Sequence, residues 1–514
     1  MDQNAWWLVE AIAALDGDDG AFLARAIRCQ VEESTVPFTQ SVVLNLLEDL
    51  RSALPITEAM TLLEEAGLLR LNEDGVPYQV TLASTTVGLD RLREKSANEG
   101  VLAALDAWTM RQLIGRVHRW VEEISQVAHD QRLAGMPTFW TCAVSGDVGL
   151  VHEPLAEDVG SMTSLDVIAL WSETLTSGQN TEPGEGIVWL LKKSLEMQDN
   201  TASSHHGAIW LADFDDDFVY NFDTDKGSYP TLDATANACS AWMRFIAEAK
   251  VGDSDIRATV SAIVSGLKFV MRSQREDGSW AVAIGEGLFG LGPDVLATRL
   301  AVLALADAID SEWLPGEVRE ACLLSLHRAA RFLTATVDPN RGCWSRSFTN
   351  TSTDTRNEET TALLLEPLRR LGGIISSELE QNALEFVGES FRVTQPHILR
   401  AEFRVPTWNG VSSSVQVWDL PFGAIVATAV ASQQCPSAAL VGPCQAALAR
   451  LVRDEVHGHW YDLGGLEEGK WRAFPSNSLL NVRALVAWAR TYVHLLEGIT
   501  THGTSRAPLL PTGD

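Results

Sequence analysis

The residues with the clearest capacity for chemistry are six aspartates within thirteen positions of one polar segment. They are Asp213, Asp215, Asp216, Asp217, Asp223 and Asp225. Neighbouring carboxylates raise one another's pKa unless a cation neutralises them. Oxygen ligands suit Mg²⁺ or Ca²⁺, so the segment is a candidate metal site or a site for a cationic partner. A solvated acidic loop is the alternative, and the glycine that an EF-hand loop requires falls one place late, at Gly227. We predict no other cofactor.

Other ligand and nucleophile patterns are weaker. His205 and His206 are adjacent, as are His457 and His459 across one glycine, but histidines in loops are more often simply exposed. No cysteine and histidine stand at zinc spacing. The sequence also lacks a GxSxG motif, a P-loop and a strand-to-helix GxGxxG motif.

The composition is that of a large acidic protein with a substantial core. The 514 residues are 46% hydrophobic and carry a formal net charge of -29, which argues against a general nucleic-acid or anionic-membrane surface. Seven cysteines, an odd number without a CxxC pair, favour a reducing compartment. We recognise no signal peptide and no run of about 18 apolar residues. We therefore expect a cytoplasmic protein without a membrane span.

The candidate metal-binding and catalytic side chains lie in a region with an internal repeat, which six tryptophans mark. Their separations are 70, 70, 64, 64 and 52 residues, and a polar loop and a helix start follow each of them. A period near 64 residues accommodates two helices, so each repeat predicts a helical hairpin that needs its neighbours to bury its apolar face. Six hairpins can close into an (α/α)6 ring. The structural repeat tryptophans are Trp140, Trp210, Trp280, Trp344, Trp408 and Trp460.

The clearest copy of the repeat is QREDGSW at residues 274–280, followed by GPDVLAT at residues 292–298. The first string resembles the QW motif of squalene and oxidosqualene cyclases. The second resembles the helix start that carries their catalytic DxDD acid. This resemblance covers about residues 135–495 and implies the helical toroid that terpene cyclases share with protein prenyltransferases. The fold alone does not decide the function.

The resemblance also implies where a catalytic acid would lie. In class II terpene cyclases the middle aspartate of DxDD protonates an alkene or epoxide. Alignment of the repeats places Asp233 at that position without flanking carboxylates, and the next repeat keeps only Asp294. A literal DxDD contains Asp215, which makes Asp215 a second candidate acid, but it lies in a loop. For Asp233 and Asp294 the alternative is a helix N-cap, which the degraded motif favours. The zinc ligands of the prenyltransferase toroids are missing.

Residues 34–98 predict a small winged-helix-like domain. A helix over 39–53, a capped helix starting at Thr57, a glycine-containing turn and an alternating strand from Tyr78 resemble that module. The expected recognition helix, residues 57–66, has three glutamates and no Lys or Arg. Because DNA contacts draw mainly on Arg, Lys, Asn and Gln, we favour protein docking or dimerisation over DNA binding.

These patterns predict a mainly α protein, with an (α/α)6 toroid preceded by a small α+β domain. The expected parts are an N-terminal helical segment (1–33), a winged-helix-like domain (34–98), a connecting helix (99–134), the cyclase-like toroid (135–498) and a flexible tail (499–514). The expected function is that of a non-catalytic or divergent toroid that binds an apolar small molecule or a protein partner in a regulatory or assembly role. One alternative is a class II terpene cyclase acting on an isoprenoid, although such enzymes usually pair two toroids. The second is a winged-helix DNA-binding regulator.

Overall fold

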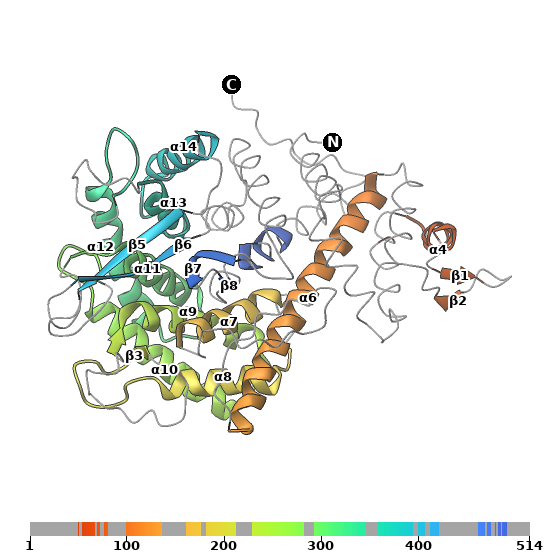
Figure 1. Ribbon diagram of the computed structural model, residues 1–514, viewed down its shortest axis with the longest axis horizontal. Coiled ribbons are helices and arrows are strands. Elements are labelled where there is room, and N and C mark those ends of the chain that lie inside the picture. The colour runs from red at the N-terminus through yellow and green to blue at the C-terminus, as the bar shows by residue number, and fades with distance from the viewer. Residues whose placement is uncertain are drawn as a thin grey trace.

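The computed structural model has helices as its main elements (Figure 1). It describes residues 50, 54–66, 69–71, 77–80, 99–135, 161–175, 181–211, 229–281, 292–345, 357–393, 399–406, 412–420, 461–467, 470–473, 479, 482–484 and 486–490. For these residues the prediction of a mainly helical fold is confirmed. Among them, no helix is both long and apolar enough to span a membrane.

Among the described residues before position 99, one helix and one β-hairpin are present. Helix α4 (Ile56–Glu65) is followed by strands β1 (Leu69–Leu71) and β2 (Pro77–Val80), which pair antiparallel. The helix starts at Ile56 with Pro55 in the N-cap position and no side-chain cap, so the predicted cap at Thr57 is wrong. Proline fits such a boundary because its fixed φ favours the start of a helix.

Helix α4 separates a buried face from an acidic one. Ala59 and Leu63 have no exposed surface, whereas the glutamates of this helix, Glu58, Glu64 and Glu65, are exposed. The apolar residues are four positions apart and therefore share one side of the helix. The outward side is negatively charged.

In the described part of the chain, a long helix and four helical pairs pack together. The long helix is α6 (Glu99–Leu133), which spans the range predicted for a connecting helix. The pairs are α7 (Ser161–Thr174) with α8 (Glu185–Glu196), α9 (Leu232–Glu248) with α10 (Asp253–Arg272), α11 (Val295–Asp310) with α12 (Gly316–Thr336), and α13 (Asn357–Arg370) with α14 (Ser377–Val393).

The four pairs stack in sequence order. Helices α7, α9, α11 and α13 each contact the next one, and in the outer row α10 contacts α12. Helix α6 packs against both α7 and α8, and its Val121 and Ala128 belong to the same hydrophobic core as the pairs. In Figure 1, α4, β1 and β2 lie on one side of α6 and the helical pairs lie on the other. Helix α6 is therefore part of the helical stack as well as a connection.

The turns before Trp210 and Trp280 each contain a glycine that packs against the next outer helix. Gly207 and Gly278 have φ values of 89° and 96°, a region that side chains other than glycine rarely occupy. A Cβ on Gly207 would lie 2.3 Å from the carbonyl oxygen of Ser265 in α10, and one on Gly278 would lie 2.3 Å from that of Arg328 in α12. The glycines thus allow successive pairs to approach closely.

A glutamine ties each of these turns to the neighbouring pair. Gln274 donates from Nε2 to the carbonyl of Gly278 at 2.9 Å and to that of Ser325 at 2.9 Å. Gln198 makes the same two kinds of bond, within its own turn at 3.0 Å and to α10 at 2.8 Å. Buried carbonyls at the pair boundaries are satisfied in this way.

The tryptophans lie between an outer helix and the next inner helix. Trp280 has no exposed surface, its Nε1 donates to the carbonyl of Val270 at 2.8 Å, and its backbone N–H donates to the Thr298 hydroxyl at 3.3 Å. Trp344 makes the equivalent contacts with α12 and α13, and Trp210 is 5% exposed. Three repeat tryptophans lie outside the described residues: Trp140, Trp408 and Trp460.

Three further strand pairs lie between or after the helices. The first, β3 (Ile209–Leu211) with β4 (Tyr229–Thr231), brackets the acidic segment. The others are β5 (Leu399–Pro406) with β6 (Ser412–Leu420) and β7 (Tyr461–Glu467) with β8 (Lys470–Ala473). All are antiparallel, and the sequence analysis expected none of them. The last described helical turns, residues 482–484 and 486–490, belong to the same core as the helical pairs.

Candidate functional site

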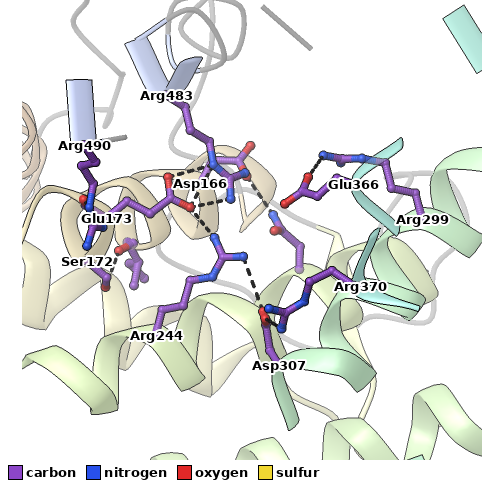
Figure 2. Close-up of polar contacts among 12 residues, drawn as sticks. Asp166, Ser172, Glu173, Arg244, Arg299, Asp307, Glu366, Arg370, Arg483 and Arg490 are labelled. Atoms are coloured by element: carbon purple, nitrogen blue, oxygen red, sulfur yellow. Dashed lines mark hydrogen bonds and ion pairs between the residues drawn. The ribbon is translucent and has the colours of Figure 1, made fainter. Parts of the chain in front are cut away.

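Charged side chains of alternating sign line one face of the stack (Figure 2). Glu173 of α7, Arg244 of α9, Asp307 of α11 and Arg370 of α13 are separated by 71, 63 and 63 residues. These separations match the repeat, so the four residues occupy equivalent places near the C-terminal ends of the inner helices. We call this set the alternating ladder.

Each member of the alternating ladder contacts its neighbours. Arg244 bonds to Glu173, and its Nη2 lies 3.4 Å from Asp307 Oδ2. Arg370 Nη2 lies 2.6 Å from Asp307 Oδ1 on the other side. The four side chains are between 14% and 33% exposed, so solvent screens them only in part. Pairs of this kind fix helix positions more firmly than fully exposed pairs do.

The C-terminal segment, by which we mean the described residues 479, 482–484 and 486–490, contacts the alternating ladder at Glu173. Arg483 reaches this carboxylate with two donors, Nε at 2.9 Å from Oε2 and Nη2 at 2.5 Å from Oε1. The two residues are 310 positions apart in the sequence. Arg490 donates from Nη1 to the backbone carbonyl of Glu173 at 2.7 Å. This bond satisfies a carbonyl in the last turn of α7, where helices leave such acceptors unpaired.

A second group of polar side chains lies nearer the N-terminal ends of the same helices. Asp166 of α7 accepts a bond from Asn237 Nδ2 at 3.0 Å, and Arg299 of α11 bonds to Glu366 of α13 at 3.0 Å. Burial raises the pKa of Asp166 above its ordinary value. Burial also opposes ionisation of Glu366, but Arg299 and Arg483 hold the pKa of Glu366 below its ordinary range.

A cavity of about 340 Å³ opens where α7, α9, α13 and the C-terminal segment meet. Three guanidinium groups and three carboxylates line it: Glu173, Arg244, Glu248, Glu366, Arg483 and Arg490. The side chains of Ala247, Val486 and Ala487 supply apolar wall between them. Figure 2 shows the labelled charged groups pointing toward one another from four helices and the C-terminal segment. The arrangement can bind a small polar molecule through charge-assisted hydrogen bonds.

The structure places the predicted acid Asp233 away from this cavity. It lies in the first turn of α9, at the opposite end of the helix from Arg244, and is half-buried. Its Oδ1 is buried without a hydrogen-bond partner. Burial raises the pKa of the Asp233 carboxyl, and the nearby charge of Asp294 adds to the rise. The N-cap of α9 is Thr231, whose hydroxyl accepts from the backbone of Ala234; the N-cap alternative for Asp233 is therefore wrong.

The other candidate residues fall into two groups. Asp294 is the N-cap of α11 and accepts from the Ala297 backbone at 2.9 Å. His206 bonds through Nδ1 to the carbonyl of Thr201 at 2.9 Å. Within the described parts of the chain, no three His, Cys, Asp or Glu residues are placed to hold a metal ion. The predicted metal ligands and second candidate acid lie outside those parts: Asp213, Asp215, Asp216, Asp217, Asp223 and Asp225.

Sequence reasoning missed the alternating ladder and the cavity. A signal was present, because Glu173, Arg244, Asp307 and Arg370 share one repeat position and alternate in sign from one repeat to the next. Aligning the repeats over their whole length, beyond the tryptophan and the helix start, would have brought these charges together.

Comparison of the sequence with protein-family models and with curated proteins finds no match.

Proposed function

We propose that this chain is a non-catalytic ligand-binding protein built on the (α/α)6 toroid of the squalene-cyclase and protein-prenyltransferase type. The stacked helical pairs and the glycine and glutamine turns before the tryptophans support that architecture. The bonds from Arg483 to Glu173, across 310 residues, also support it, because ring closure brings the first and last pairs together. A closed ring would leave no open end of the stack to cap.

The cavity is the observation that carries a binding function. Its volume of about 340 Å³ suits a small organic molecule, and it lies where the first inner helix meets the C-terminal segment. Six charged side chains line the cavity. We therefore propose that it binds a polar ligand, and not the apolar small molecule that the sequence led us to expect. Asp233, the predicted proton donor, is not among the described residues that line the cavity.

Filling the cavity tests this function. A compound that binds at a hundred times its Kd should stabilise the protein by about 2.7 kcal/mol, which a thermal-shift screen of small acids, amino acids and phosphates would detect. Ala247→Trp should abolish the shift, because the indole would occupy the cavity. Ala258→Trp, at an exposed position of α10, is the matched control and should leave the shift intact. Shifts that persist unchanged in Ala247→Trp would place the ligand elsewhere.

The N-terminal part fits a regulatory or assembly role. The exposed side of α4 carries Glu58, Glu64 and Glu65, and such a face repels phosphates. We therefore propose that a winged-helix-like domain here docks a protein partner, in preference to DNA.

A second candidate function, class II terpene cyclisation, is favoured by the environment of Asp233. Burial raises the pKa of the Asp233 carboxyl, which is the direction that an acid catalyst requires. The flanking carboxylates of the motif would stand at positions 231 and 234, however, and these positions hold Thr231 and Ala234.

Product analysis separates the two functions. The protein would be incubated with geranylgeranyl diphosphate, farnesyl diphosphate or squalene, and extracts compared for wild type and Asp233→Asn. We expect no cyclised product from either form. A product made by the wild type and absent from Asp233→Asn would establish the cyclase and overturn the non-catalytic proposal.

A further inference from the structure

Arg490 differs from the other arginines around the cavity in its partners. Its Nη1 donates to the carbonyl of Glu173, and no carboxylate among the described residues forms an ion pair with it. A guanidinium group has five N–H donors in a planar fork, so one bond to a carbonyl leaves most of them for another acceptor. The group lies on the lining of the cavity.

The neighbouring guanidinium groups each pair with at least one carboxylate. Arg244 and Arg483 share Glu173, and Arg299 pairs with Glu366. Arg370 pairs with Asp307 and with Asp310, the latter at 3.0 Å. In the described part of the site, a bound molecule therefore meets one guanidinium without a carboxylate.

The rest of the lining limits the size and charge of that molecule. Val486 is 1% exposed, and it forms apolar wall in the cavity with Ala247 and Ala487. Glu173 and Glu366 face the same space, so they oppose a second negative charge. A planar group with one negative charge and two oxygens matches the fork of Arg490 better than a phosphate dianion does.

We propose that the cavity binds a small organic acid and that Arg490 pairs with its single carboxylate, with the apolar part of the ligand against Val486. This inference rests on the proposed function, since it names the class of ligand for the same cavity.

Three phenyl compounds that differ in their polar group test the charge requirement on the full-length protein. Benzoate, benzamide and phenyl phosphate would be titrated by calorimetry or ligand-observed NMR. Benzoate should bind at least about tenfold more tightly than the neutral benzamide, the difference expected for a hydrogen bond to a charged group. Phenyl phosphate should bind more weakly than benzoate.

Substitutions assign the effect to Arg490. Arg490→Gln should weaken the binding of benzoate by about ten- to hundredfold and leave the binding of benzamide nearly unchanged. Arg490→Lys should retain part of the preference for benzoate over benzamide. Arg257→Gln is the matched control, because Arg257 is exposed on α10 and is not on the cavity lining, and it should not change benzoate binding. Circular dichroism and the Tm of each variant would establish that it is folded.

Each other outcome overturns the inference. Tighter binding of phenyl phosphate would make the cavity a phosphate site. Equal binding of benzoate and benzamide, insensitive to Arg490→Gln but lost in Ala247→Trp, would refute the role of Arg490 and leave the proposed function standing. Binding that Ala247→Trp does not affect would refute both, and so would the absence of binding by every probe and every screened compound.

Discussion

Replacing Glu173 by glutamine is expected to lower the free energy of unfolding by about 3 kcal/mol, because two arginines lose their shared carboxylate. Arg244 and Arg483 both bond to this side chain, which is 19% exposed. Removing one partner of such a pair costs more than the pair contributes, since the remaining charge stays partly out of water. Urea unfolding monitored by circular dichroism measures the change.

A surface pair provides the control for Glu173. Glu196 bonds to Lys193 at 2.8 Å and is 63% exposed, so Glu196→Gln should change stability by less than about 0.5 kcal/mol. Hydrogen exchange adds a test of location, because residues 482–490 should exchange faster in Glu173→Gln than in the wild type. A stability loss equal to that of Glu196→Gln, with unchanged exchange, would refute a joining role for Glu173.

Trp280→Ala is expected to destabilise the protein by about 4 kcal/mol, the usual cost of deleting a buried indole. The side chain has no exposed surface, and its Nε1 bonds to the carbonyl of Val270. Truncation removes that bond and leaves a cavity between α10 and α11 that the rigid helices cannot fill. Chemical denaturation gives the change in unfolding free energy.

Trp313→Ala separates this effect from loss of aromatic area in general. Trp313 is 39% exposed, so its truncation should cost roughly 1 kcal/mol, within the range of ordinary substitutions. If both variants unfolded at the same urea concentration, Trp280 would not hold the helical pairs together.

The helical character and the paired helices could be predicted from local patterns. Trp280, Gly278 and Gln274 lie within seven residues of one another, and each makes its contacts where the repeat recurs. Local motifs of this kind specify both the turn and the close packing of the next helical pair. Their spacing alone is therefore enough to predict the paired helices. The helix start at Asp294 likewise follows from capping chemistry, whereas α9 is capped by Thr231 and not by the predicted Asp233.

The site was missed because its contacts join distant repeats, which only an alignment of the whole repeats would bring together. Glu173 meets Arg244 from 71 residues away and Arg483 from 310 residues away, and no local pattern specifies which charges face one another. The expected acid, Asp233, was placed by analogy with a motif. The raised pKa of its carboxyl and its unpartnered oxygen depend on the packing around α9. Strands β5 to β8 were missed because the helical repeat was assumed to continue to residue 498, through the residues that form these strands.

The alternating ladder restricts how the number of repeats can change. Repeat proteins commonly gain or lose single units, since each unit contacts only its neighbours. Here, deletion of the unit formed by α11 and α12 would place Arg244 beside Arg370, and duplication of one unit would place two like charges in contact. Removing or adding two adjacent units keeps opposite charges next to each other. Because the signs alternate, units can be added or removed without bringing like charges together only when an even number of them changes.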